Sequence, residues 1–290
     1  MTRFGYTLMT EQSGPKDLVR HAAGAEQAGF DFEVASDHYF PWLSSQGHAP
    51  YVWSVLGAVA HVTGRVDLAT YVTCPILRYH PAVVAQKAAT VQILSDGRFM
   101  LGVGAGENLN EHVVGQRWPA VDERHEMMVE ALEIIGELFD GGLVTYSGEH
   151  FRVDSARLWD LPTTRVPVGV AAGGPKAVSA LGPLADHLIA TEPDGGYIDQ
   201  WNALDGQRRI GDGARAIAQI PVSWDPESEK AAVERAHDQF RWFAGGWATN
   251  ADLPTTAGFA AATEFVRPDD VAVHFKRDAS EIALFQAARA

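Results

Sequence analysis

The chain has 290 residues, of which 46% are hydrophobic and 21% are charged, as is typical of a globular protein. Its formal charge of −14 argues against nucleic-acid binding, because a phosphate backbone requires clustered Lys and Arg. The apolar runs are too short to span a bilayer, and the N-terminus lacks the pattern of a secretory signal. We therefore predict a cytoplasmic protein without a membrane partner. The single cysteine, Cys74, excludes a disulfide framework and a cysteine-built metal site. We expect it to be a buried apolar residue at a strand end, and we predict no metal site.

Short apolar runs alternate with longer segments of helical period, which is the pattern of βα units around a parallel sheet. In chain order, the predicted strands are residues 3–9, 31–36, 66–74, 98–106, 166–174, 186–194, 214–225 and 280–286. The predicted helices are residues 14–30, 51–63, 80–97, 122–141, 175–185, 196–204, 227–245 and, as a short one in a Thr/Ala-rich stretch, 268–275. Residues 143–165 indicate a β-hairpin excursion.

Eight parallel strands with intervening helices predict an α/β fold, a (β/α)₈ TIM barrel. Without repeats or a linker, residues 1–290 are expected to form one domain with one insertion. Only four residues follow the last predicted strand, so we expect a shortened C-terminal region without the usual eighth helix. In such a barrel the active site lies at the carboxyl ends of the strands.

The second predicted strand ends in "SDHYFPW". His38 could act as a general base, since its unperturbed pKa lies near neutrality. Asp37 could orient a base, but adjacent residues of an extended chain point in opposite directions. Trp42 could form an aromatic wall, although a surface turn with a buried tryptophan fits the same letters. His48, further along this segment, is assigned a structural role or a place at the substrate rim.

The fourth predicted strand ends in "GVGAGENLNEH", where small residues allow close approach of a ligand and a loop is expected to follow. Glu107 and Asn110 would enter the same space. The run does not fit a dinucleotide fingerprint, because the third glycine and an immediate helix are absent. A tight turn with a solvated Glu107 is the alternative.

The third predicted strand ends in "TYVTCPILRYHP", which could present backbone to a flat ring, while His80 before Pro81 is expected to cap or pack. The fifth parallel strand ends in "AAGGPKAVS". There, Gly173 and Gly174 precede a helix, whose first backbone N–H groups are free to bind an anion, and Lys176 adds positive charge. A phosphate-binding site is therefore favoured over a plain helix cap.

Five segments together resemble the luciferase-like family in order and spacing over most of residues 4–193: "SDHYFPW", "YVTCPILRYHPAVVAQ", "GRFMLGVGAGENLNE", "RHEMMVEAL" and "VAAGGPKAV". The similarity is to the branch that uses the deazaflavin coenzyme F420 and includes actinobacterial glucose-6-phosphate dehydrogenases. It implies a barrel that holds the deazaflavin at its strand carboxyl ends, with a bulge and a non-proline cis peptide at Tyr71–Val72. The coenzyme contacts that it implies are Asp37, Tyr71, Val72, Thr73, Ala105, Gly106, Asn110, Ala172, Gly173, Gly174 and Lys176.

By the same resemblance, His38 takes the hydroxyl proton while the substrate carbon gives a hydride to the ring. Trp42 shields the reacting centre, and Glu107 serves the N1 side of the reduced ring. These three are the catalytic residues that the resemblance implies, and a homodimer is expected on the same ground.

The sequence departs from the sugar-phosphate enzymes where those supply lysine and arginine. Glu192 and Asp194 occupy a loop in which those enzymes have a lysine, so their carboxylates would repel a substrate phosphate. The region of Ala262 and Thr263 contains no lysine either. The aromatic "FRWFAGGW" favours a less polar substrate, with a helix core as the alternative.

We therefore predict an F420-dependent oxidoreductase that acts on an alcohol/carbonyl pair or an activated alkene. An FMN-dependent luciferase-like monooxygenase is the first alternative. A catalytically silent relative is the second.

Overall fold

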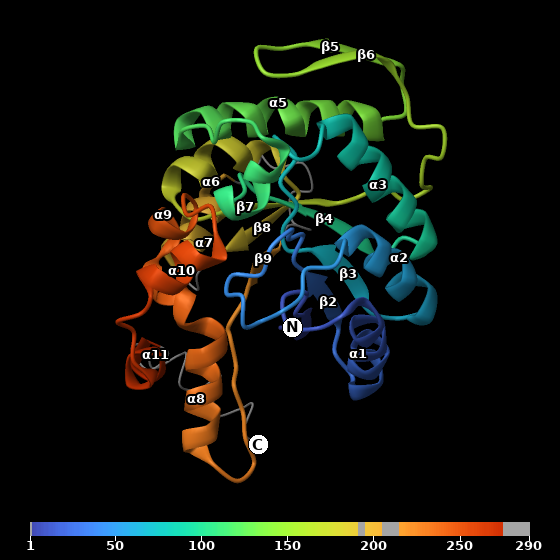
Figure 1. Ribbon diagram of the computed structural model, residues 1–290. Helices are drawn as coiled ribbons and strands as arrows, with labels where there is room; N and C mark the ends of the chain where they lie inside the picture. The colour runs from blue at the N-terminus through green and yellow to red at the C-terminus, as the bar shows by residue number, and fades with distance from the viewer. Residues whose placement is uncertain (1, 191–194, 205–214, 275–290) are drawn as a thin grey trace.

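The computed structural model describes residues 2–190, 195–204 and 215–274, and its centre is a parallel sheet of seven strands in the order β1-β2-β3-β4-β7-β8-β9 (Figure 1). The strands are Gly5–Leu8 (β1), Phe32–Ala35 (β2), Asp67–Thr70 (β3), Phe99–Val103 (β4), Val168–Ala172 (β7), His187–Ala190 (β8) and Ala216–Ala218 (β9). Gln219, just after β9, donates from Nε2 to Oγ1 of Thr7 in β1 over 3.1 Å. The two outer strands of the sheet therefore meet, and the curled sheet confirms the TIM-barrel-like α/β fold.

Helices pack around the outside of this sheet, as expected for βα units. They are Pro15–Ala28 (α1), Val52–Val62 (α2), Pro81–Leu94 (α3), Val121–Phe139 (α5), Pro175–Leu181 (α6) and Gly195–Ala203 (α7). Helix Glu229–Phe240 (α8) extends away from the sheet and packs against the C-terminal helices instead (Figure 1). Helix α1 has Pro15 in its first turn and ends at Gly29, which adopts the left-handed φ of 97° that favours glycine. His80 caps α3, since its Nδ1 accepts from the backbone N–H of Ala82 at 3.2 Å.

Two buried clusters make up the apolar interior. The larger one fills the layer between sheet and helices, and Cys74 belongs to it, as expected from the sequence. The smaller one consists of Trp42, Leu43, Leu109, Trp242 and Phe259. It joins the segment after β2 to the C-terminal part of the chain.

The excursion between the fourth and fifth barrel strands is the expected antiparallel hairpin, Val144–Ser147 (β5) and Arg152–Ala156 (β6). Figure 1 shows it above α5. The carboxylate of Glu130 in α5 fixes the hairpin, because it accepts hydrogen bonds from the backbone N–H groups of residues 149–151.

The short helices that follow the strands differ from the expectation. A helix at Asn108–Glu111 (α4) and a 3₁₀ turn at His112–Val114 replace the loop expected after β4. The Thr/Ala-rich region forms Trp247–Asn250 (α9) and Thr256–Ala262 (α10) as well as the expected Pro268–His274 (α11). Thr255 supplies the missed start signal of α10, since its hydroxyl accepts from the N–H of Gly258.

The predicted strand at 280–286, with the chain end beyond it, lies outside the described residues, as do Glu192 and Asp194. None of the helices in the described part of the chain combines the length and the apolar character that crossing a membrane would require.

Candidate active site

The chain forms a bulge directly after β3. Regular pairing with β4 reaches Ala69↔Met100 and resumes only at Thr73↔Val103, so the β3 side contains one extra residue. The peptide bond Tyr71–Val72 within this bulge is cis, as the family resemblance implies. The predicted strand 66–74 is therefore cut short at Thr70 by the bulge.

The glycines of "GVGAG" make room for this bulge. A Cβ at Gly102 would lie 2.1 Å from the carbonyl oxygen of Thr70, and one at Gly104 would lie 2.8 Å from Cγ2 of Val72. At Gly106, which has a φ of 73°, a Cβ would lie 2.5 Å from Sγ of Cys74. The run is thus explained by close packing of two neighbouring strand ends, with Ala105 and Gly106 left partly accessible at the mouth.

Asp37, at the end of β2, is buried and anchors the bulge. Its Oδ2 accepts from Nε1 of Trp53 at 2.9 Å and from Oγ1 of Thr73 at 2.8 Å. Its Oδ1 accepts from Nη2 of Arg78 at 3.1 Å and from the hydroxyl of Tyr79 at 3.3 Å. Four protein donors therefore hold this carboxylate, and none of them is His38.

His38 pairs with Glu11, a residue that the sequence analysis did not single out. Nδ1 of His38 lies 2.8 Å from Oε1 of Glu11, and both side chains are buried. Glu11 follows β1, so the pair brings together the carboxyl ends of the first two strands. The expectation that His38 and Asp37 point in different directions is confirmed.

The Glu11–His38 pair alters the pKa of both groups. Burial acts to lower the pKa of His38, but the charge of Glu11 and its hydrogen bond outweigh burial and raise it. The pKa of Glu11 is lowered because the His38 charge and hydrogen bond overcome the opposing effect of burial. Glu107 also raises the pKa of His38 through its charge. The imidazole can therefore hold a proton near neutral pH.

Glu107 lies at the start of α4, and Asn110 lies within that helix. Oδ1 of Asn110 accepts from the backbone N–H groups of Tyr39 and Phe40 at 2.8 and 3.1 Å, which fixes the chain just beyond His38. Nδ2 of Asn110 approaches Oε2 of Glu107 at 3.5 Å. Glu107 is partly exposed, so its carboxylate can contact a ligand.

Trp42 contacts His38 edge to face, with ring centroids 4.9 Å apart and planes at 76°. Its ring is 4% exposed, because Trp242 stacks on it and Phe259 packs edge-on. Trp42 is therefore a buried tryptophan and also one wall beside the imidazole.

A second set of charged side chains, Arg78 and Glu111, lies next to Asp37. Arg78, in the loop between the bulge and α3, lies between Asp37 and Glu111, with its Nε 3.4 Å from Oε1 of Glu111. Burial raises the pKa of Glu111 to about 7 although Arg78 opposes that effect. Neither Arg78 nor Glu111 was predicted as a site residue from the sequence, where the run "ILRYHP" near the third strand end is the signal for the cation.

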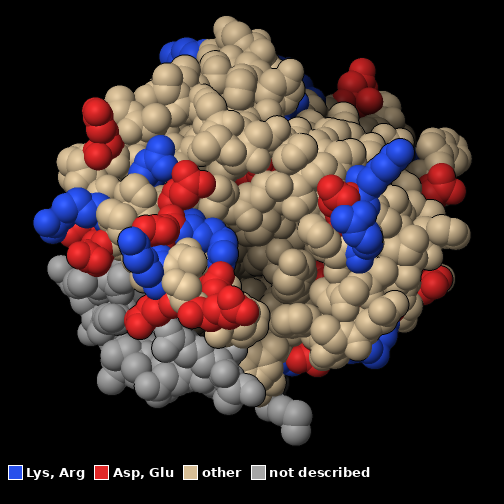
Figure 2. Space-filling model, turned by 60° about the horizontal axis from the view of Figure 1, so that its bottom comes forward, with Lys and Arg blue, Asp and Glu red and all other residues tan. Residues whose placement is uncertain are grey.

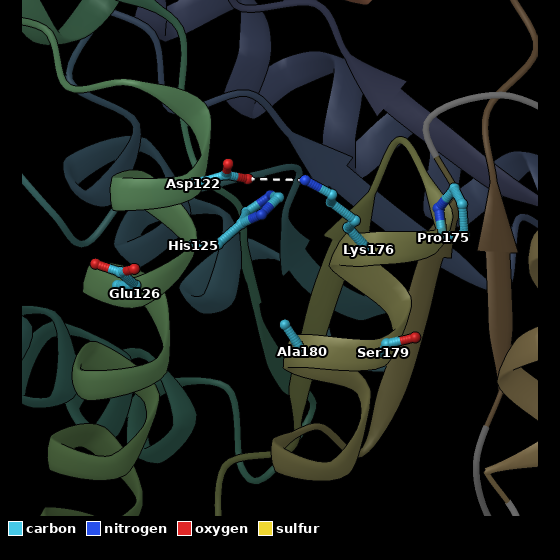
Figure 3. A pocket seen from close by; sticks show the side chains of 7 residues that line it. All are labelled: Asp122, His125, Glu126, Pro175, Lys176, Ser179 and Ala180. Carbon is cyan, nitrogen blue, oxygen red and sulfur yellow. Dashed lines mark hydrogen bonds and ion pairs between the residues drawn. The ribbon is translucent and has the colours of Figure 1, made fainter.

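Gly173 and Gly174 lie between β7, which ends at Ala172, and α6. A Cβ at Gly174 would meet no atom of the described residues within 4 Å, so this part of the chain leaves the backbone there open to a ligand. Lys176 turns instead toward Asp122 of α5, Nζ to Oδ1 at 3.2 Å (Figure 3). These two side chains, with His125 and Ser179, line an open pocket of about 760 Å³ between α5 and α6.

His48 lies in a different groove, between α1 and α2, together with Tyr51 and Ser54. Its backbone N–H donates to the carbonyl oxygen of Glu11 at 3.0 Å, which ties this segment to the end of β1. On the face drawn in Figure 2, a hollowed and largely uncharged centre is surrounded by basic and acidic side chains in mixed groups.

Comparison with known proteins identifies the family. The model of the luciferase-like monooxygenase family matches residues 1–289, and the chain belongs to this family. This confirms the resemblance on which the sequence analysis relied.

Relatives with assigned functions are F420-dependent dehydrogenases. A protein of Amycolatopsis mediterranei named F420-dependent glucose-6-phosphate dehydrogenase is 40% identical over 80% of this chain and 72% of its own length. A Mycobacterium tuberculosis protein named F420-dependent hydroxymycolic acid dehydrogenase is 38% identical over 83% of this chain and 67% of its own. Among solved structures, an F420-dependent secondary alcohol dehydrogenase in complex with an F420-acetone adduct superposes with a TM-score of 0.84 at 32% identity, covering 93% of this chain and 84% of that one.

Proposed function

We propose that this protein is an F420-dependent oxidoreductase that moves a hydride between the deazaflavin and an alcohol/carbonyl pair or an activated alkene, and that its substrate is not a sugar phosphate. The observation that carries this proposal is the buried Glu11–His38 pair beside Trp42, at the strand ends where this fold binds its ligands. The names of the relatives support the coenzyme.

The residues of the site fit a flat coenzyme with a phosphate-bearing arm. The bulge at Tyr71, Val72 and Thr73 offers backbone beside the accessible Ala105 and Gly106, and we propose that the ring lies against these residues. The exposed Gly173 and the open backbone at Gly174 would hold the phosphate, with Ala172 ending the strand behind them. Lys176 would contribute its charge after leaving its exposed contact with Asp122, an ion pair that contributes little.

Asp37 and Asn110 would shape this coenzyme site. Asp37 fixes Thr73 and Arg78, and Asn110 fixes the chain after His38, so both set the position of the surfaces that touch the ring. Glu107, which approaches Asn110 and is partly exposed, would serve the N1 side of the ring.

His38 would exchange a proton with the substrate oxygen. As a neutral base it takes the hydroxyl proton during alcohol oxidation, and as an imidazolium it donates a proton during carbonyl reduction. Its raised pKa favours the protonated form, which is the form that donates a proton to a carbonyl oxygen. Glu11 holds the ring by Nδ1, which leaves Nε2 to face the substrate. Trp42 excludes water from this side of the reacting atoms.

The surroundings of the proposed centre favour an uncharged substrate. The buried cluster against Trp42 consists of Leu43, Leu109, Trp242 and Phe259, and none of these residues is charged. In α10 and at Thr263 after it there is no lysine or arginine, and the Thr263 hydroxyl donates to the carbonyl oxygen of Phe259 at 2.7 Å. A phosphate group would find no charge-assisted hydrogen bond there.

Fluorescence titration with the deazaflavin and with FMN tests the coenzyme. We expect tight binding of the deazaflavin and weak binding of FMN. Tight binding of FMN alone would support the monooxygenase alternative, and binding of neither would support the silent relative. Absorbance of the oxidised deazaflavin in the presence of a panel of alcohols then tests the substrate class.

The variant His38→Ala tests the proton-transfer role. We expect coenzyme affinity to stay nearly unchanged and turnover to fall by roughly 10²-fold or more, because a general acid–base group is lost. His61→Ala, an exposed histidine on α2, is the matched control and should retain activity. Loss of affinity with normal turnover would contradict this role.

We also propose a homodimer, as the family resemblance implies, and a cytoplasmic location, as the sequence predicts. Light scattering of the purified chain tests the oligomer, and a monomer at micromolar concentration would refute it.

A further inference from the structure

The ring of Trp42 is enclosed by side chains from a distant part of the chain. Trp242 lies parallel to it, with centroids 4.1 Å apart and planes at 9°, which is a stacked contact. Trp247 and Phe259 meet it edge-on at 6.2 and 5.2 Å. We call Trp42, Trp242, Trp247 and Phe259 the aromatic wall. Three of its four members come from the segment before α9, from α9 and from α10, which lie together at the left of Figure 1.

One buried side chain connects the two halves of this wall. Oε1 of Gln46 accepts from the N–H of Leu43, and its Nε2 donates to the carbonyl oxygen of Gln239, both at 3.1 Å. The same carbonyl oxygen accepts from Nε1 of Trp242 at 3.1 Å. The position of Trp242 is therefore defined relative to the loop that carries Trp42.

A second set of contacts ties the segment to the Glu107 turn. The N–H of Asn108 donates to the carbonyl oxygen of Ala251, and Nδ2 of Asn108 donates to that of Asp252. Nδ2 of Asn250 donates to the carbonyl oxygen of Trp242 at 3.3 Å. The segment that carries Trp242 is thus attached both to the loop after β2 and to the turn after β4.

We propose that Trp242 is a specificity-determining residue, which fixes Trp42 from behind and thereby limits the size of the group that a substrate carries next to His38. This inference rests on the proposed function and adds the substrate class, a small uncharged secondary alcohol or its ketone. The wall presents only aromatic surface, which favours hydrocarbon substituents and disfavours charged ones.

The physical argument concerns the freedom of Trp42. Its ring meets the His38 ring at a steep angle, and Trp242 covers one of its faces, so movement of the Trp42 ring away from the imidazole is restricted. Close packing of this kind resists displacement, and a bulky substituent would have to push both rings aside. A smaller side chain at position 242 opens space behind Trp42, into which that ring can move.

The test compares two ketones of different size, acetone and 4-heptanone, in reduction by wild type, Trp242→Leu and Trp242→Phe. For Trp242→Leu we expect the ratio of kcat/KM for 4-heptanone to that for acetone to rise by at least about tenfold, the scale on which pockets discriminate between apolar groups. Trp242→Phe keeps an aromatic ring and should show a smaller rise, which also covers the case that the leucine variant does not fold. The dissociation constant of the deazaflavin should change by less than about twofold.

Two further measurements separate specificity from simple damage. Acetamide and hexanamide do not react, and calorimetry measures their affinities. The ratio of the affinity for hexanamide to that for acetamide should change in the same direction as the ratio of kcat/KM for the two ketones. Trp201→Phe, a buried tryptophan of α7 in the other core cluster, is the matched control and should leave the ratio unchanged.

An unchanged ratio in both Trp242 variants, with equal losses for both ketones, would overturn the inference while leaving the proposed function intact. If the wild type binds no deazaflavin, the proposed function fails, and the inference fails with it. If it binds the deazaflavin and reduces an activated alkene but no ketone, the inference fails and the proposed function stands.

Discussion

Two adjacent residues, Asp37 and His38, have separate partners and separate roles. On the extended chain their side chains point in opposite directions, so Asp37 meets Trp53 and Thr73 while His38 meets Glu11. The carboxylate that tunes the imidazole is therefore supplied by a different strand end. Asp37, the neighbour of His38 in the sequence, instead accepts a hydrogen bond from Thr73 at the bulge.

Glu11→Gln should lower the pKa of His38, because it removes the negative charge that stabilises the imidazolium. The group loses its proton at lower pH, so the alkaline decline of carbonyl reduction and the rise of alcohol oxidation should both move to lower pH, by at least about one unit. The pH profile of kcat/KM measures this shift. Glu229→Gln, on the exposed start of α8, is the control. An unchanged midpoint would refute the pairing as the source of the raised pKa.

At the scale of elements, the end of β4 is shaped by the bulge after β3. Each glycine of "GVGAG" lacks a side chain and so leaves room for one group in or next to the bulge. The hydroxyl of Thr70 donates to the carbonyl oxygen of Gly102 and accepts from its N–H. The extra residue on the β3 side can be accommodated because the glycines at the end of β4 have no side chains. This packing leaves the cis peptide at the mouth.

Gly106→Ala should destabilise the protein more than Gly115→Ala does. Both glycines have a positive φ, 73° and 75°, so an alanine is strained by about 1 kcal/mol at either. At Gly106 the new methyl group also meets Sγ of Cys74, whereas at Gly115 no atom lies within 4 Å. We expect an additional loss of about 1–3 kcal/mol at Gly106 from overpacking. Urea unfolding of both variants measures it, and equal losses would contradict the close packing.

At the scale of the whole molecule, the layer between sheet and helices encloses an acid. Glu33 of β2 is fully buried, lies opposite Tyr6 and Leu68 in the sheet register, and accepts no hydrogen bond from the described residues. Burial raises the pKa of its carboxyl from 4.5 to about 8, with the charge of Glu26 acting in the same direction. The folded state therefore binds this proton more tightly than the unfolded state does.

Stability should consequently fall as the pH rises from about 5 to about 8. A group whose pKa is raised on folding contributes stability below its unfolded pKa and loses that contribution as the pH passes its folded pKa. Glu33→Gln, which cannot ionise, should flatten this decline and be more stable than wild type at pH 8. Urea unfolding at several pH values measures it, with the exposed Glu264→Gln as control. Parallel curves for wild type and Glu33→Gln would refute the burial of an acid here.

Much of the fold follows from local patterns. Periodicity located the parallel strands within the described residues, most of the helices and the hairpin, and chain order then placed His38, Glu107 and Gly173 at strand carboxyl ends. The cis peptide at Tyr71–Val72 came from the family resemblance, since nothing in the local composition marks it. The short helices α4, α9 and α10 were missed, because a few residues carry too little periodicity to stand out.

The sequence by itself determined the alternation of strands and helices, because each element depends on residues within a few positions of one another. Only the tertiary structure decided which side chains meet. Glu11 joins His38 because β1 and β2 are neighbours in the curled sheet. Gln46 and Gln239, 193 positions apart, are joined because the C-terminal segment folds back over the same mouth. Such pairings depend on how the sheet closes, and no local pattern along the chain encodes that geometry.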